Sequence, residues 1–248
     1  MFYCLVKELP LIKLTNFNLK ERMGLLLIAL DAGHGGIDPG AVANGLLEKD
    51  LTLQLALKTG TYLRTHYTCE VVYTRNKDVA VELSERTRIA NMVKADLFCS
   101  FHINSFDNVS KGFESYRYPG SSKALELQRN VHTEIMNILK KYKIVDRGMK
   151  EKNLAVVRKT VMPALLTEIL FISNPEEAKL LKSEGFLDEV AQAHAIGIAK
   201  TARLIQNNNK QDKKHYLQTG TFKNKEEAEK QAQMLKDKYG WQVNIFEA

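Results

Sequence analysis

The sequence predicts an α/β domain in which helices cover both faces of a central, mostly parallel sheet. Two observations support this prediction. A continuous apolar run at 25–30 and the largely apolar segments at 95–104 and 164–171 are typical of buried strands. Longer segments between these runs carry apolar residues at helical spacing, so strands and helices alternate along the chain. In sheets of this kind, sites form beyond the carboxyl ends of the strands.

Each element is predicted from its own pattern, in chain order. The run at 25–30 is apolar throughout and stops at Asp31, which indicates a buried strand that ends in a loop. Residues 48–66 repeat apolar side chains at helical spacing, and 69–75 is rich in β-branched residues, as strands are. Similar patterns predict further strands at 95–104, 154–157 and 164–171, and helices at about 82–94, 122–142, 175–182 and 186–205.

The two ends of the chain fall outside this pattern. Residues 1–23 are interpreted as an N-terminal extension and 24–206 as the main domain. Residues 207–214 are polar and low in complexity, as linkers are. Residues 215–248 predict a short βαβ-like segment, below the ~40 residues that usually fold unaided. We expect no membrane span, and the start of the chain lacks the apolar core of a signal peptide.

Composition narrows the classes of function. The 248 residues are 44% hydrophobic and 26% charged, which is typical of a globular protein. Three widely spaced cysteines predict neither a disulfide framework nor a thiolate zinc knuckle. The formal charge of +7 favours an anionic partner, either nucleic acid or bacterial wall polymers, although a lysine-rich surface explains it equally well. No run of arginines with aromatics supports nucleic-acid binding, and we expect no nucleic-acid partner.

Two candidate functional residues flank the first predicted loop. His34 lies in DAGHGGIDPG (31–40), where glycines allow the backbone to turn sharply after a buried strand. The glycines match neither of the common phosphate-binding fingerprints. Glu48 opens the following helix, where a glutamate by itself more often only compensates the helix dipole.

Two later strands carry further candidates. Alternation along 95–104 places His102 and Asn104 on one face and Cys99 on the other, which weakens a Cys/His peptidase interpretation. A single strand histidine is more often a core residue than a ligand. Glu168 lies within ALLTEILF (164–171), where burying a carboxylate is costly unless it has a cation, a strong donor or a catalytic role.

Taken together, these residues resemble a catalytic zinc site. Two histidines and one glutamate are a known ligand set that leaves one position for water. Zinc would lower the pKa of that water and polarise a scissile carbonyl. Glu168 would take the proton of the water and return it to the leaving nitrogen. An arginine partner for Glu168 remains the structural alternative.

The chain resembles the zinc-dependent N-acetylmuramoyl-L-alanine amidases of sporulation and cell-separation autolysins and of phage endolysins. The similarity spans about 25–205 and departs from the family mainly at Ala32, where the family usually has proline. The motifs that carry it are DAGHGGIDPGA (31–41), GLLEKD (45–50), TRNKD (74–78), LSERTRIAN (83–91), ADLFCSFHINS (95–105), GFESY (112–116) and PALLTEILFISNPEE (163–177).

This resemblance implies a role for each candidate and a fold. His34, Glu48 and His102 are expected to bind one Zn²⁺, and Glu168 to be the catalytic glutamate. Asn104 is expected to contact substrate or orient a ligand. A three-layer domain with a central sheet of about six strands is implied as well. The remaining histidines match no ligand position: His66, His132, His194 and His215.

Residues 215–248 also resemble the first half of a SPOR-type glycan-binding repeat. The resemblance as a whole implies a peptidoglycan hydrolase that cleaves the amide between N-acetylmuramic acid and L-alanine. Other interpretations are a zinc amidase or carboxypeptidase of different substrate choice, and a catalytically silent peptidoglycan-binding protein. We expect a monomer that acts at the bacterial cell wall, outside the cell, after release by lysis or by an unconventional route.

Overall fold

A computed structural model of the protein describes residues 2–4 and 25–207, and beyond these 220–222, 225–227, 229–230, 233–234 and 245–247. The chain divides into two compact units. Residues 17–207 form the larger one, and residues 1–16 together with 208–248 form the smaller one. None of the described helices is long and apolar enough to cross a membrane.

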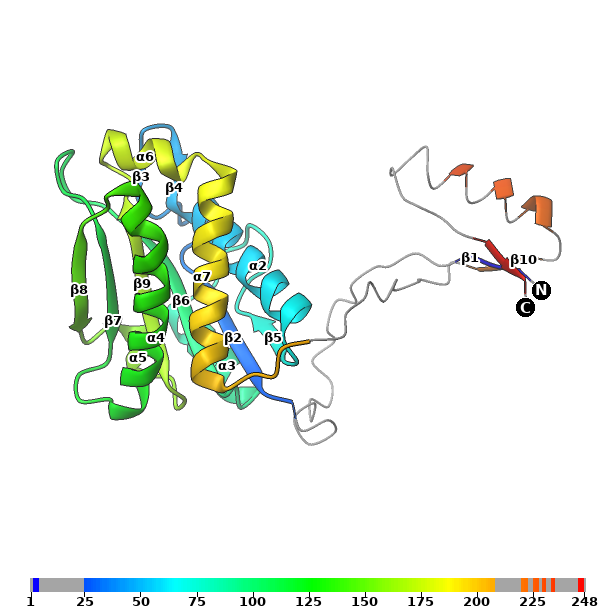
Figure 1. Ribbon diagram of the computed structural model, residues 1–248, viewed down its shortest axis with the longest axis horizontal. Coiled ribbons are helices and arrows are strands. Elements are labelled where there is room, and N and C mark those ends of the chain that lie inside the picture. Colours follow the sequence, from blue (N-terminus) through cyan, green and yellow to red (C-terminus); the bar gives the residue numbers. More distant parts are fainter. Residues whose placement is uncertain are drawn as a thin grey trace. The chain divides into compact units, whose positions relative to one another are not determined.

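The larger unit is built on a six-stranded sheet with the strand order β5-β2-β6-β9-β7-β8 (Figure 1). Neighbouring strands are parallel except β7 and β9, which are antiparallel. The predicted α/β fold with a mostly parallel sheet is therefore confirmed. The strands are β2 (Leu27–Ala32), β5 (Glu70–Tyr73), β6 (Leu97–Asn104), β7 (Phe113–Arg117), β8 (Asp146–Glu151) and β9 (Ala164–Phe171).

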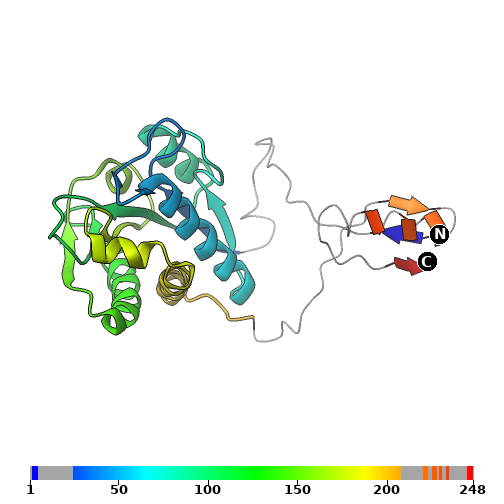
Figure 2. The same ribbon diagram turned by 90° about the horizontal axis from the view of Figure 1, so that it is seen from above.

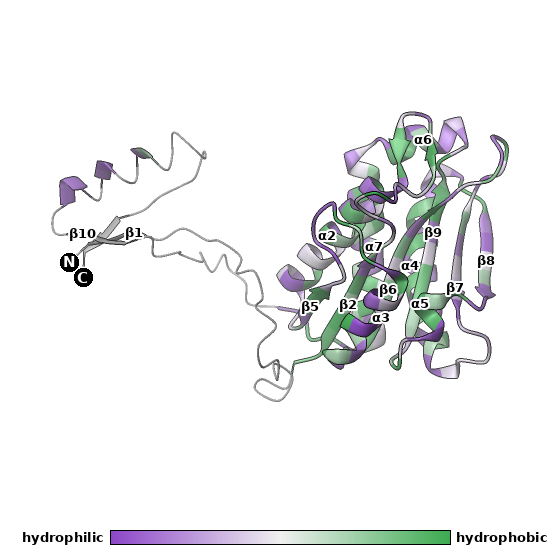
Figure 3. Ribbon diagram, turned by 180° about the vertical axis from the view of Figure 1, so that it is seen from behind, coloured by the Kyte–Doolittle hydropathy of each residue, from purple (hydrophilic) through white to green (hydrophobic). Residues whose placement is uncertain are grey.

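Helices cover both faces of this sheet and complete three layers (Figure 2). Helices α2, α4 and α7 pack on one face over the larger apolar cluster, and α3 and α5 pack on the other face over a smaller one. Figure 3 shows the inner strands β2, β6 and β9 as the most hydrophobic ones. The helices are α2 (Glu48–His66), α3 (Leu83–Met92), α4 (Ser122–Leu139), η1 (Lys140–Tyr142), α5 (Ala155–Arg158), α6 (Pro175–Leu181) and α7 (Glu184–Ala202).

One predicted strand is wrong. Residues 154–157 were expected as a strand, but they begin the helix α5. A four-residue apolar run does not distinguish a buried helical turn from a strand. The strand of this region is β8, whose sequence DRGMKE lacks an apolar alternation because β8 lies at the edge of the sheet. The strand β7 (Phe113–Arg117) was not predicted either.

The smaller unit contains a three-stranded sheet formed by both ends of the chain. Strand β1 (Phe2–Cys4) lies between β10 (Gly220–Phe222) and β11 (Ile245–Glu247) and is antiparallel to both. The N-terminal residues thus supply a strand to the C-terminal segment. Most of the predicted extension 1–23, of the linker 207–214 and of the segment 215–248 lies outside the described residues.

A buried histidine links α7 to the sheet and makes stability depend on pH. His194 is fully buried, its Nδ1 lies 2.8 Å from the Val190 carbonyl oxygen, and its Nε2 lies 3.0 Å from Thr167 Oγ1. Burial lowers the pKa of His194 to about 4, against the opposing effect of the Val190 hydrogen bond. The unfolded chain, with its ordinary histidine pKa of about 6.5, therefore takes up a proton between pH 6.5 and 4 that the folded chain does not.

The stabilising contribution is complete above pH 6.5 and is lost as the pH falls towards 4. We expect His194→Gln to reduce the slope of the unfolding free energy against pH in this window by up to about 1.4 kcal/mol per pH unit. Urea denaturation at several pH values measures this slope. The matched variant is His66→Gln at an exposed histidine of α2, which makes the same substitution outside the core. An unchanged slope for His194→Gln would show that His194 is not the group that titrates.

Candidate metal centre

His34 is presented by the loop that follows β2. Its backbone is left-handed, with φ of 60°, and the side chains of Arg75 and Arg86 hold the carbonyls of this loop. Asp38 Oδ2 lies 2.8 Å from His34 Nδ1, so this carboxylate can accept an N–H at Nδ1 and leave Nε2 as the ring atom that would bind a metal ion. A carboxylate in this position fixes both the tautomer and the orientation of a ligating histidine.

Glu48 begins α2 and reaches both histidines with one oxygen. Its Oε1 lies 3.2 Å from His34 Nε2 and 3.1 Å from His102 Nδ1, and it also accepts the backbone N–H of Ile103. The other oxygen, Oε2, accepts the Ala41 N–H at 2.9 Å. The short hairpin of β3 (Val42–Ala43) and β4 (Leu46–Leu47) connects the His34 loop to this helix start.

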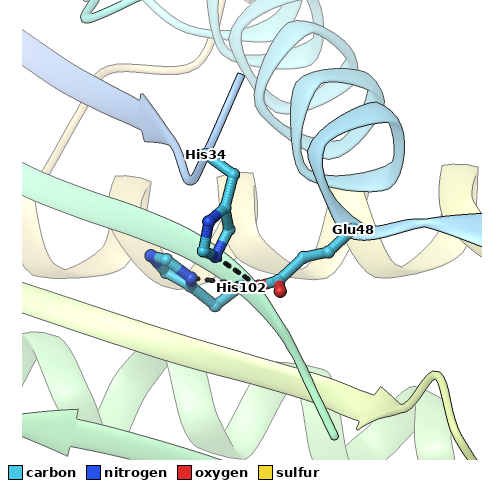
Figure 4. Close-up of side chains that lie close together, drawn as sticks. All are labelled: His34, Glu48 and His102. Carbon is cyan, nitrogen blue, oxygen red and sulfur yellow. Dashed lines mark hydrogen bonds and ion pairs between the residues drawn. The ribbon is translucent and has the colours of Figure 1, made fainter. Parts of the chain in front are cut away.

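His102 lies on β6. This strand is the direct neighbour of β2 in the sheet, and β2 leads into the loop that carries His34. The predicted alternation holds, because Cys99, Phe101 and Ile103 lie in the larger apolar cluster on the opposite face. Figure 4 shows the side chains of His34, Glu48 and His102 pointing towards one another from a loop, a helix start and a strand. One possible ligand atom from each lies within 4.8 Å of the other two.

The site is electrostatically suited to a cation. Burial by itself raises the pKa of Glu48, but its hydrogen bonds with His102 and His34 lower it well below the usual range. The hydrogen bond with Glu48 conversely raises the pKa of His34 to about 9 despite burial. A buried carboxylate that attracts protons onto two imidazoles would equally attract a divalent metal ion.

The donor set fits zinc. Two imidazole nitrogens and one carboxylate oxygen form a ligand set that catalytic zinc sites use. Gly40 also leaves room for the ligands, because a Cβ at this position would lie 2.7 Å from Glu48 Oε2 and from His34 Cδ2. Among the residues that the structure describes, His34, Glu48 and His102 are the group that could hold a metal ion.

Glu168 lies on β9 directly beside His102 in the strand register. Its Oε2 is buried and has no hydrogen-bond partner among the described residues. Burial raises the pKa of Glu168 to about 7; His102 opposes this rise, and the charges of Glu48 and Glu114 add to it. Among the described residues, the arginine partner considered from the sequence is absent from the hydrogen bonds and ion pairs of this carboxylate, which lies beside His102 of the candidate metal centre in the strand register.

The chain bends immediately after Glu168. The register between β6 and β9 shifts after the His102–Glu168 pair, and Leu170 is buried with a left-handed φ of 61°. Such bulges re-aim side chains next to sites. Glu177, at the start of α6, holds the bulge because its oxygens accept the N–H groups of Phe171 and Gly112 at 2.7 and 2.8 Å.

Asn104 lies on the same face of β6 but contacts a protein carboxylate. Its Nδ2 donates to Glu114 Oε1 at 2.5 Å, and its Oδ1 accepts the N–H of Ser105. Glu114 in turn lies opposite Glu168 in the β7–β9 register. Asn104 therefore supports a second carboxylate beside Glu168 and does not contact the three converging side chains in the described structure.

Two arginines for which the sequence predicted no role hold the loop that carries His34. Arg75 donates to the carbonyls of Ala32 and Gly33, and Arg86 donates to the carbonyl of His34 at 2.7 Å. Arg86 also pairs with the buried Asp31 at 2.9 Å. Arg75 lies in the motif TRNKD and Arg86 in the motif LSERTRIAN. The presence of these arginines in two of the motifs was the signal from which their supporting role could have been predicted.

Gly33 is required for the position of His102. A Cβ on Gly33 would lie 2.4 Å from Cε1 of the His102 ring, which is far closer than carbon atoms approach without bonding. We expect Gly33→Ala to displace this ring and to weaken zinc affinity about tenfold or more. Competition with a chromophoric chelator measures the affinity. Gly185→Ala, where the nearest atom is 3.9 Å away, is the matched control; equal affinities for both variants would contradict the prediction.

The fold and these side chains define a class: an α/β enzyme domain with a two-histidine, one-glutamate centre and a buried free carboxylate at the carboxyl ends of its strands. Residues 28–200 match the family described as N-acetylmuramoyl-L-alanine amidase. The chain therefore belongs to this family. The predicted resemblance is confirmed at the level of the family and of its amidase members.

Similar proteins come from phages and bacteria. The endolysin of Bacillus phage SPP1 is 50% identical over 181 residues, which cover 72% of this chain and 66% of the endolysin. The N-acetylmuramoyl-L-alanine amidase CwlM of Bacillus licheniformis is 42% identical over 74% of this chain and 71% of its own length.

A solved structure supports the same assignment. The catalytic domain of CwlV, an N-acetylmuramoyl-L-alanine amidase from Bacillus (Paenibacillus) polymyxa var. colistinus, superposes with a TM-score of 0.69 at 34% identity. The match covers 73% of this chain and 100% of that domain. The larger unit thus has the fold of an amidase catalytic domain.

Proposed function

We propose that the protein hydrolyses the amide bond between N-acetylmuramic acid and the L-alanine of the peptidoglycan stem peptide. The observation that carries this proposal is the convergence of His34, Glu48 and His102 beside the unpartnered Glu168 carboxylate, in a member of the amidase family. We assign the three converging residues as ligands of one Zn²⁺ and Glu168 as the catalytic glutamate.

Zinc, when bound, supplies Lewis-acid chemistry that polarises the scissile carbonyl and makes water a stronger nucleophile. The residues of the chain prepare the site for this chemistry. Asp38 keeps the proton of His34 on Nδ1, so Nε2 is available as a ligand atom. Glu48 contributes the negative charge, and its contact with the Ile103 N–H fixes its direction.

Glu168 moves the proton. Its half-buried carboxylate accepts a proton from the attacking water while the oxygen of that water bonds to the carbonyl carbon. It then donates the proton to the amide nitrogen as the carbon–nitrogen bond breaks, which releases lactyl carboxylate on the glycan and a free alanine amine on the peptide. Burial raises the pKa of this carboxyl above its usual range, which favours the return of the proton to the leaving nitrogen.

The rest of the chain would bring this site to the wall. The formal charge of +7 favours binding to anionic wall polymers. The segment 215–248, which resembles a partial SPOR repeat, would serve as a wall-binding element joined through the linker 207–214 to a catalytic domain at 24–206. We propose that the protein acts as a monomer at the bacterial cell wall, outside the cell.

Digestion of purified peptidoglycan tests the proposed reaction. An amidase is expected to release free stem peptides with an N-terminal alanine amine, together with glycan chains that lack peptide, both identified by mass. New reducing sugar ends would indicate a glycosidase, and internal peptide fragments would indicate a peptidase. Binding to peptidoglycan without any release by zinc-loaded protein would contradict the proposal and support a catalytically silent binding protein.

A further inference from the structure

A row of charged side chains crosses the sheet from the candidate metal centre to its edge. His102 on β6 is paired in register with Glu168 on β9, and Glu168 is paired with Glu114 on β7. Partners in register point to the same face of a sheet. The next strand, β8, continues the row with Arg147 and Lys150, which both contact Glu114.

Glu114 is buried, and its two oxygens already have partners. Oε1 accepts from Asn104, and Oε2 accepts from Arg147 Nε at 3.0 Å and from Lys150 Nζ. Burial raises the pKa of Glu114, but the hydrogen bonds from Lys150, Tyr116 and Arg147 lower it by more, so the carboxyl is ionised. One cation would balance this charge, and the cluster holds two.

The surplus positive charge faces solvent. The side chain of Glu114 is 4% exposed, whereas those of Arg147 and Lys150 are 35% and 39% exposed. Arg147 directs Nε to Glu114 and lies over the Phe171 ring at 4.9 Å, which fixes the plane of its guanidinium. Its Nη1 also donates to the Lys111 carbonyl at 3.4 Å, and the remaining N–H groups are held in a fixed direction, as carboxylate recognition requires.

The position of the two cations indicates which part of a substrate they would meet. They come from a strand two places from that of Glu168, which corresponds to about 10 Å across a sheet. A peptide covers about 3.5 Å per residue when extended. A group in the first two or three residues beyond the scissile amide therefore reaches them.

We propose that Arg147 and Lys150 form a subsite for a free carboxylate of the stem peptide, close to the alanine that the enzyme releases. This inference rests on the proposed amidase function. Glu114 and Asn104 act as positioning residues, because Asn104 holds Glu114 and Glu114 holds the two cations near Glu168 through Arg147 Nε and Lys150 Nζ, which leaves Arg147 Nη2 for a ligand. The subsite would favour stem peptides with a free carboxylate over peptides in which that carboxylate is amidated.

The test compares two soluble muropeptides that differ only in a carboxylate or a carboxamide at the second residue of the stem. A charge-assisted contact predicts that the wild type prefers the carboxylate about tenfold in kcat/KM, mainly through KM. Lys150→Met and Arg147→Met are each expected to reduce this ratio towards one. Because both peptides are assayed on one sample, the ratio does not depend on the fraction of folded enzyme.

Two further variants separate charge from structure. Lys150→Arg keeps the charge and should retain the preference. Lys123→Met removes an exposed charge at the start of α4, on the opposite face, and should leave the ratio unchanged. Equal kcat/KM values for both peptides with wild type, or an undiminished preference in both methionine variants, would overturn the subsite while the amidase function stands. Failure of wild type to cleave either peptide would instead overturn the proposed function.

Discussion

Glu168→Gln is expected to lower kcat for amide hydrolysis by about 10²- to 10⁴-fold, the range of a lost general base. Glutamine fills the same space on β9 but cannot accept the proton of water. Because Glu168 lies beside His102 without a hydrogen bond to the three converging residues, zinc binding should persist in the variant. Activity on a soluble muropeptide and zinc content of the same sample provide the two readouts.

The matched control is Glu176→Gln at an exposed glutamate of α6, whose carboxylate pairs only with the neighbouring Lys179 at the surface. This control should retain the wild-type kcat. A Glu168→Gln protein with bound zinc and a wild-type kcat would show that another group moves the proton. A variant without zinc would show that Glu168 helps to hold the metal.

Arg86→Met is expected to destabilise the fold by about 3–5 kcal/mol, because it leaves the Asp31 carboxylate buried without its cation. Asp31 is fully buried, and its oxygens also accept from Thr74 Oγ1 and Ser100 Oγ at 2.5 and 2.6 Å. The same substitution removes the donor to the His34 carbonyl. The free energy of unfolding should therefore fall, and zinc affinity should fall with it because the loop that carries His34 is no longer held in place.

Urea unfolding measures the first effect and zinc affinity the second. Arg88→Met on the same helix is the control, since Arg88 is 57% exposed and pairs with Glu85 at the surface. The double variant Asp31→Asn with Arg86→Met should recover part of the lost free energy, because no charge is then left buried. A loss below about 1 kcal/mol for Arg86→Met, the value of a surface pair, would contradict the expected role.

The sequence alone was informative where burial imposes a pattern. The strands β2, β6 and β9 lie inside the sheet, and most of their side chains are buried and apolar, which marks them in the sequence. The edge strand β8 carries DRGMKE, whose charged side chains reach the cation cluster and solvent, and no apolar period marks it. Prediction therefore succeeded for β2, β6 and β9 and for the edge strand β5, whose β-branched residues marked it, and failed for the neighbouring pair β7 and β8.

The candidate site was also predicted in part: the sequence indicated its central residues but not the contacts that support them. His34 follows a predicted strand, and Glu48 begins the next predicted helix. His102 and Glu168 lie in the carboxyl-terminal halves of predicted parallel strands, so the convergence follows from the parallel sheet. The supporting contacts depend on long-range geometry that spacing does not encode. The Arg86–Asp31 pair joins residues 55 apart, and the contact of Glu114 with Lys150 joins residues 36 apart. Asn104 illustrates the limit, since its partner became visible only in the structure.

Zinc content measured together with amide cleavage tests the central claim most directly. Wild-type protein should carry one zinc ion per chain, lose cleavage when a chelator removes it, and regain cleavage when zinc is added back. His102→Ala should neither retain zinc nor regain activity. Full cleavage by protein shown to be free of metal, or restored cleavage in His102→Ala with stoichiometric zinc bound elsewhere, would contradict the account.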